Sequence, residues 1–178
     1  MKSITTPRFL FLTMAILIAA MSRLFPHIPN FTPIAAMALF GGAHFKDKVS
    51  AVLIPLIAMF ISDCFIQLTT GTGFHITMFP VYFSITLITF IGMYVKRNMN
   101  VQSVMIGSLV SSVLFFMITN FAVWIAYNYD QGFNGLVSTY IMGIPFFAHT
   151  IAGDLFFNGI LFGSFYFAQK RIPALIKA

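Results

Sequence analysis

The sequence predicts an all-α membrane protein, a compact bundle of about six transmembrane helices, and three observations support this prediction. First, 59% of the 178 residues are hydrophobic and only 8% are charged, whereas about a quarter of the residues of a soluble domain are charged. Second, apolar runs long enough to cross a bilayer recur along the whole chain. Third, the basic residues fall between these runs in an alternating pattern. We therefore expect one integral membrane domain that covers residues 1–178.

The apolar runs give the expected positions of the transmembrane helices. A helix needs about 20 predominantly apolar residues to cross the hydrocarbon core. On this criterion the expected spans are approximately 8–25, 29–45, 49–68, 76–95, 101–127 and 141–169. The last two runs exceed the required length, so we expect these helices to tilt or to protrude.

The positions of lysine and arginine predict the orientation of the chain. Nine of the ten basic residues fall on one side of the expected bundle, and only Arg23 falls on the other. The nine are Lys2, Arg8, Lys46, Lys48, Lys96, Arg97, Lys170, Arg171 and Lys177. Because loops rich in basic residues stay in the cytoplasm, we expect a multi-pass protein of the bacterial cytoplasmic membrane with both termini in the cytoplasm.

The first apolar run also has features of a signal peptide. Lys2 and Arg8 precede an apolar stretch that ends with the small residues Ala19 and Ala20. We expect this run to be retained, because residues 23–27 are typical of a tight turn into the second span.

Small residues recur at a spacing of four, which is typical of helix packing in membranes. Such pairs are Ala15 with Ala19, Gly107 with Ser111, Ser108 with Ser112, and Gly159 with Gly163. The first interpretation is packing within the bundle. The alternative is that the face with Ala15 and Ala19 docks another membrane subunit.

Two acidic residues lie within the expected spans, and such residues are typically paired or functional because their insertion is costly. Asp63 is expected near the outer end of the third span. Asp154 is expected near the middle of the sixth, on a polar stripe with Thr150 and Asn158. Either carboxylate is a candidate partner of Arg23 in a structural ion pair. Either is also a candidate solute contact, since a buried pair can line a pocket.

Aromatic and amide side chains gather at the expected outer end of the fifth span. Asn120, Trp124, Tyr127 and Asn128 make a stripe that suits a planar, hydrogen-bonding solute. The alternative is an interfacial belt, in which Trp and Tyr lie at the depth of the lipid headgroups.

Three histidines are also expected at the outer side. His27 and His75 lie in expected outer loops and His149 lies at the start of the sixth span, so a metal site is a weak candidate. The interpretation as hydrogen-bonded loop and helix-end residues is favoured, because no metal-ligand spacing links them. His75 and Met78 belong to an uncharged loop rich in glycine and threonine, which could act as a lid or be an ordinary outer loop.

Several segments carry a resemblance to a known family. The segment from Arg23 to Pro33 reads RLFPHIPNFTP, and residues 36–42 read AMALFGG. With Ser62-Asp63, Ala152-Gly153-Asp154 and Asn158, they resemble an uncharacterised bacterial family of membrane proteins described as transporters, over nearly the whole chain. The layout is similar, more distantly, to the S-components of energy-coupling-factor (ECF) vitamin transporters.

The resemblance to S-components implies a small-molecule substrate and a mode of action. Such proteins bind a vitamin or a metal ion near the outer face and reorient in the membrane to release it. Many dock a transmembrane coupling subunit, driven by ATPases, through small residues of the first helix, here Ala15 and Ala19. Cobalamin is a cargo of solitary relatives and is the favoured cargo here, ahead of other vitamins or a metal ion. Certain cobalamin binders have a cysteine after the third span, but Cys64 lies within that span, which leaves His75 or Met78 to approach cobalt.

The leading hypothesis is a binding subunit for solute uptake that contacts the solute through Asp63, His75, Met78, Asn120, Trp124, Tyr127, His149 and Asp154. The chain has no phosphate-binding glycine loop for ATP hydrolysis, and we expect no intrinsic cofactor and no nucleic-acid partner. One alternative is an intramembrane enzyme that uses His and Asp for acid-base chemistry, although no nucleophile-base motif supports it. The other is a structural or assembly protein that uses its small-residue faces.

Overall fold

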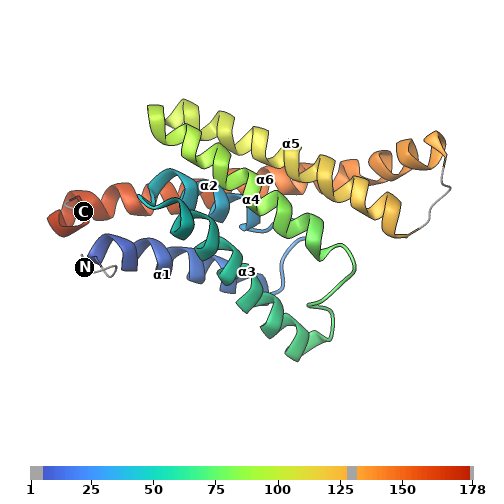
Figure 1. Ribbon diagram of the computed structural model, residues 1–178, viewed down its shortest axis with the longest axis horizontal. Coiled ribbons are helices and arrows are strands. Elements are labelled where there is room, and N and C mark those ends of the chain that lie inside the picture. The colour runs from blue at the N-terminus through green and yellow to red at the C-terminus, as the bar shows by residue number, and fades with distance from the viewer. Residues whose placement is uncertain (1–5, 128–131, 177–178) are drawn as a thin grey trace.

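The computed structural model describes residues 6–127 and 132–176, and within these ranges the chain forms six α-helices and no strand. The helices are α1 (Pro7–Met21), α2 (Ile34–His44), α3 (Lys48–Thr70), α4 (Met78–Val95), α5 (Val101–Ala126) and α6 (Phe133–Arg171) (Figure 1). Single 3₁₀ turns occur at Ser22–Leu24, Lys96–Asn98 and Pro173–Leu175. The predicted all-α bundle is confirmed. The predicted roles of Lys2, Asn128 and Lys177 lie outside the described residues.

Polar side chains begin several of these helices, as the sequence requires. Thr6, Asp47 and Asn100 accept hydrogen bonds from the backbone N–H groups at the starts of α1, α3 and α5. These caps satisfy donors that have no partner inside the helix. Gly71 ends α3 in the left-handed conformation, with φ of 74°, which a residue without a Cβ adopts at little cost.

Five helices are long and apolar enough to cross a membrane, and α2 is the exception. Its 11 residues extend over about 16 Å at 1.5 Å per residue, about half the thickness of the hydrocarbon core. The prediction of a continuous second span over 29–45 is therefore wrong. Pro29 and Pro33 interrupt it because each lacks a backbone N–H, and Asn30 between them has a positive φ of 64°.

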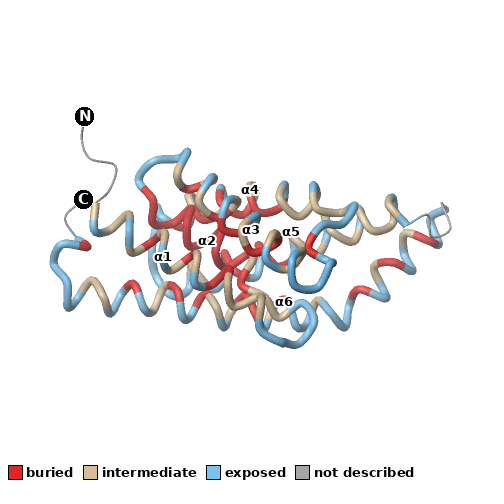
Figure 2. The backbone as a smooth tube through the Cα atoms, turned by 90° about the horizontal axis from the view of Figure 1, so that it is seen from below, coloured by how far each residue is buried: buried red, intermediate tan, exposed pale blue. Residues whose placement is uncertain are grey.

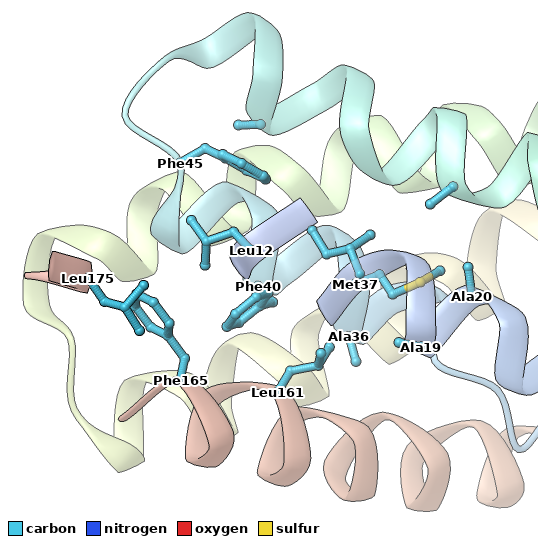
Figure 3. Packing of buried hydrophobic residues seen from close by; sticks show 13 residues of the cluster. Leu12, Ala19, Ala20, Ala36, Met37, Phe40, Phe45, Leu161, Phe165 and Leu175 are labelled. Atoms are coloured by element: carbon cyan, nitrogen blue, oxygen red, sulfur yellow. The ribbon is translucent and has the colours of Figure 1, made fainter. Parts of the chain in front are cut away.

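Despite its length, α2 lies inside the bundle. Every residue from Ala35 to His44 is buried, and Figure 2 shows that the buried residues concentrate around this helix. Its Met37 and Phe40 pack with Leu12 of α1 and with Leu161 of α6 (Figure 3). The core is thus built around a half-length helix.

Large apolar side chains cover the outside of the bundle. Leu68 and Phe79 are 83% and 79% exposed, and many others are about half exposed. An outer surface of this kind suits lipid as the surrounding solvent. The chain is therefore a multi-pass membrane protein.

The start of α1 and the end of α6 lie together at one end of the bundle (Figure 1). The Arg8 guanidinium lies 5.4 Å from the centre of the Phe165 ring, and Leu175 packs in the same cluster as Leu12. The connection to α2 and α2 itself together return the chain to this end. The two described ends therefore lie at the same end of the bundle, even though α2 is only a half-length helix.

The carboxyl-terminal end of α2 is satisfied by basic side chains at this same end of the bundle. Arg8 donates to the carbonyl oxygen of His44 at 3.1 Å, and Lys96 donates to that of Phe45 at 2.5 Å. Cations are favourable there because the last carbonyls of a helix carry partial negative charge.

At the other end of the bundle, the end of α5 and the start of α6 project together beyond the other helices (Figures 1 and 2). The 39 residues of α6 correspond to about 58 Å, longer than a bilayer including its headgroups. The expected sixth span, 141–169, is thus extended at its start to Phe133. The expectation that the last two helices protrude is met by this hairpin.

The small-residue pairs divide into packed and unpacked faces. Gly107, Ser108, Ser111 and Ser112 are buried where α5 meets the rest of the bundle, as the packing interpretation predicts. Around Gly159 and Gly163, in contrast, a Cβ would find no atom within 4 Å. Both glycines line an open groove of about 590 Å³ that faces His44 of α2 and Val104 of α5. For this G-x-x-x-G pair the prediction of close packing within the bundle is wrong, because no other helix fills the space over the glycines.

Candidate functional site

A polar cavity of about 230 Å³ lies at the amino-terminal end of α2, inside the membrane-spanning bundle. The turn after α1, the connection to α2, α5 and α6 enclose it. It is lined by Arg23, His27, Asn30, Thr32, Ile34, Ala35, Phe115, Thr150 and Asp154. Polar side chains thus converge from three parts of a chain that is otherwise strongly apolar, namely the turn after α1, the connection to α2, and α6.

Larger cavities exist, but they are apolar grooves between neighbouring helices. The largest, about 760 Å³, runs between α4 and α5 and is lined by side chains such as Phe90, Ile91 and Ile106. Another lies between the first turns of α4 and the last turns of α5. Grooves of this kind suit lipid chains, whereas a binding site combines an enclosed cavity with a few placed polar groups. The small polar cavity is therefore the candidate site.

Asp154 is the most buried charged group of the cavity, with 1% of its surface exposed. Ser112 of α5 donates its hydroxyl to Oδ2 at 2.6 Å, and the backbone N–H of Ala36 also donates to the carboxylate. Ala36 lies in the first turn of α2, where Pro33 provides no side-chain cap. Asp154 therefore takes the place of a capping residue and faces the partial positive charge of the helix amino terminus.

Arg23 lies on the other wall of the cavity and forms an ion pair. Its Nη1 lies 2.7 Å from Oδ1 of Asp63 and also contacts Ser62 Oγ and, at 3.0 Å, Met59 Sδ. Tyr82 of α4 donates to the second oxygen, Oδ2, of Asp63 at 2.7 Å. Of the two partners that the sequence left open, Arg23 therefore pairs with Asp63. This network joins the turn after α1 to α3 and α4.

Two further groups of the cavity present hydrogen-bond acceptors. Thr150 donates its hydroxyl hydrogen to the carbonyl of Phe146 at 3.1 Å, which leaves its oxygen lone pairs available. His27 Nδ1 lies 2.7 Å from the carbonyl oxygen of Phe25, so Nδ1 carries a hydrogen. In the neutral ring Nε2 is then an acceptor.

The predicted outer aromatic stripe lies outside the cavity. Asn120 donates to Phe116 within α5 at 2.9 Å, and its side chain fills the space over Gly143 of α6. Trp124 contacts the Phe121 ring at 5.6 Å, and Tyr127 is exposed at the end of α5. These residues belong to the projecting hairpin, and none of them lines the cavity.

The predicted loop contacts also lie elsewhere. His75 is exposed, with Nδ1 2.9 Å from the hydroxyl of Thr77. Met78 begins α4, and His149 is exposed on α6. Among the eight predicted solute contacts, Asp154 is the one that lines the cavity.

The weak metal candidate is not supported by the geometry. Within the described ranges, no three His, Cys, Asp or Glu side chains come close enough to hold a metal ion together. His27 lines the cavity, whereas His75 and His149 do not.

Sequence reasoning missed the contribution of Asn30, Thr32 and Phe115. The signal that could have found the first two is the pair Pro29 and Pro33, which marks a break in an apolar run where backbone groups lose their helical partners. Phe115 carries no such signal, because it is one of 23 phenylalanines.

Comparison with protein families places residues 3–175 within a family model described as a family of unknown function (DUF6580). Neither the curated proteins nor the solved structures gave a match.

Proposed function

We propose that this chain, which belongs to the family of unknown function DUF6580, is a membrane-embedded binding protein that takes up a small polar solute through the cavity at the amino terminus of α2. One observation supports the proposal above the others: the second span is broken, and polar groups gather at the break. In a purely structural bundle, an unbroken apolar helix would serve better.

The physical argument concerns the backbone. Non-helical backbone at membrane depth is tolerated where protein covers it or where it lines a wet cavity. Discontinuous helices are also a recurring feature of solute sites in membrane transporters, because the free N–H groups at a half-helix terminus bind polar ligands. In this chain, the N–H groups of Ile34 and Ala35 are at the first turn of α2, and both residues line the cavity.

The volume of the cavity constrains the solute. About 230 Å³ is below the usual range of about 300–1,000 Å³ for sites of drug-sized ligands. A corrin ring with its nucleotide tail is far larger, so the geometry favours a solute smaller than cobalamin. The preference for cobalamin as cargo stays a prediction from the resemblance alone.

A coupling partner belongs to the same proposal. Ala15 and Ala19 line an apolar groove of about 400 Å³ between α1 and α6, beside Phe157 and Ile160. A small-residue groove admits close approach of another helix, so this is the surface we propose for a transmembrane coupling subunit that acts with ATPases.

The proposed orientation places both termini in the cytoplasm of a bacterium, and reporter fusions test it. A fluorescent protein fused after Ala178 should fluoresce, and alkaline phosphatase at the same position should be inactive. Alkaline phosphatase inserted after Thr72, in the loop between α3 and α4, is the matched control and should be active. Active phosphatase after Ala178 would refute the orientation.

The uptake proposal is tested by replacing two matched threonines of α6. Thr150 and Thr139 are both buried, and each donates its hydroxyl to a carbonyl four residues earlier, but Thr150 alone of the two lines the cavity. Thr150→Val should weaken retention of the native solute about three- to tenfold, the effect of one hydrogen bond. Thr139→Val should retain the solute as the unmodified protein does.

The measurement is mass spectrometry of small molecules that copurify with the full chain in mild detergent. Solute uptake by cells that express each variant should follow the same order. If no small molecule distinguishes Thr150→Val from Thr139→Val, the cavity is not the uptake site.

A further inference from the structure

The buried charges of the bundle do not balance. Asp63 and Asp154 are 2% and 1% exposed, and Arg23 is the basic residue beside the cavity. Arg23 and Asp63 neutralise each other at 2.7 Å. Over residues 6–127 and 132–176 this is the one ion pair between side chains, so Asp154 has no basic side chain as its partner.

Asp154 also keeps unused hydrogen-bonding capacity. A carboxylate offers about four acceptor positions, whereas the structure assigns it two donors, the Ser112 hydroxyl and the Ala36 N–H. The carboxylate lines the cavity, so its remaining capacity is available to a bound molecule. Ser112 and Ala36 explain how Asp154 holds α2, but they do not neutralise a full charge.

Three of the groups around Asp154 match a donor rather than an acceptor, whereas the N–H groups of Ile34 and Ala35 require an acceptor elsewhere on the solute. Thr150 presents oxygen lone pairs, because its hydrogen is used within α6. The neutral imidazole ring of His27 presents Nε2 as a hydrogen-bond acceptor. The Phe115 ring forms an apolar wall of the same cavity, and the face of such a ring attracts cations. A positively charged nitrogen with several N–H groups satisfies these three partners.

From this arrangement we infer that the solute is a small organic amine, bound as an ammonium ion against Asp154. The inference rests on the proposed uptake function and names its substrate class. Asn30 and Thr32, on the connection to α2, lie where they can bind a hydroxyl or carbonyl on the rest of the solute. A cation that enters from outside is also driven inward by the membrane potential, which acts on each charge that crosses.

The test uses the purified full chain in detergent, with thermal unfolding followed at increasing ligand concentration. Ethanolamine hydrochloride and methylamine hydrochloride are the amine probes. Ethylene glycol is the neutral counterpart of ethanolamine, sodium acetate is the anionic probe, and magnesium chloride tests a metal ion. The amines should raise the melting temperature with saturation, because a ligand that binds the folded state stabilises it. The other three should not.

Two substitutions locate the binding. Asp154→Asn keeps an acceptor for Ala36 and Ser112 but removes the charge, and it should weaken amine binding at least tenfold. Asp47→Asn, which removes an exposed carboxylate at the start of α3, should leave binding unchanged. Should Asp154→Asn not fold, Thr150→Val removes a neighbouring contact of the same ammonium ion and should weaken amine binding about three- to tenfold.

The outcomes separate this inference from the uptake proposal. Saturable stabilisation by glycol, acetate or magnesium without amine binding would overturn it, as would amine binding that Asp154→Asn leaves intact. If the solute lost in Thr150→Val proves neutral or anionic, the uptake proposal stands and the amine inference fails. If the amines bind at Asp154 but cells that express the chain take up no solute, the reverse holds.

Discussion

Replacing Arg23 by methionine is expected to lower the free energy of unfolding by about 3–5 kcal/mol, the cost of leaving one member of a buried ion pair without its partner. Asp63 is 2% exposed, and among the described side chains it would keep the Tyr82 hydroxyl alone as a donor. Ser62 and Met59 would lose their contacts with Nη1 at the same time. The turn after α1 would then lose its polar attachment to α3.

A double-mutant cycle separates loss of the pair from loss of packing. Arg23→Met combined with Asp63→Leu removes both charges and should recover most of the stability lost in Arg23→Met alone, because no unpaired charge remains. Arg97→Met is the matched control, since this exposed guanidinium lies 5.6 Å over the Tyr94 ring and is worth about 1 kcal/mol or less. Reversible unfolding in mixed detergent micelles, followed by circular dichroism, gives the free energies of the unmodified protein, Arg23→Met, Asp63→Leu, the double variant and the control. An effect of Arg23→Met no larger than that of Arg97→Met would contradict the structural role of the pair.

The ion pair shows how far the sequence could predict the site. The distribution of basic residues placed Arg23 alone at the opposite side of the bundle, and the cost of buried charge marked Asp63 and Asp154 as its possible partners. The choice between them depends on the 3₁₀ turn at Ser22–Leu24, which turns Arg23 toward α3. Residues 40 positions apart in sequence meet there, and no local pattern encodes that contact.

Most of the fold could be predicted because hydrophobic length is a local property. The expected third span at 49–68 corresponds to α3 at Lys48–Thr70, and the fifth at 101–127 to α5 at Val101–Ala126. The prediction of the second span failed because apolar composition alone does not distinguish a helix from an extended segment that is covered by protein. Pro29 and Pro33 carried the missing information.

The site was less predictable, since it is assembled from distant segments. Asp154 was predicted because burial of a carboxylate is costly wherever it occurs. Trp124 and Tyr127 were predicted to contact the solute because they lie at the end of the fifth span, but α5 and α6 extend past the other helices and carry these residues away from the cavity (Figure 1). The connection to α2 also lies close to α6, where a Cβ on Gly153 would lie 3.0 Å from the Thr32 backbone nitrogen.

Replacing Gly42 by alanine tests the position of α2 itself, and it is expected to destabilise the protein by about 3 kcal/mol. A Cβ at this position would lie 2.1 Å from the carbonyl oxygen of Thr89 and 3.0 Å from the Cα of Gly92, both on α4. Backbone atoms cannot rotate aside as a flexible side chain can, so α2 and α4 must separate. Overpacking of a dense core costs about 1–3 kcal/mol, and this contact belongs at the upper end because α2 is buried on all sides.

Gly42→Ala should also weaken binding of the solute at the cavity, because the helix that packs against α4 is the helix whose first turn lines the cavity. Movement of α2 away from α4 displaces its first turn, whose Ala36 N–H donates to Asp154. Gly163→Ala is the matched control, because the added methyl group would meet no atom of a neighbouring helix within 4 Å. Alanine's helix preference should leave stability unchanged or raise it by up to about 1 kcal/mol. Unfolding in mixed micelles measures stability, and retention of copurified solute measures the cavity. Equal stability of the Gly42→Ala and Gly163→Ala variants would mean that α2 does not pack closely against α4. The first turn of α2 would then not be held in place as a wall of the cavity.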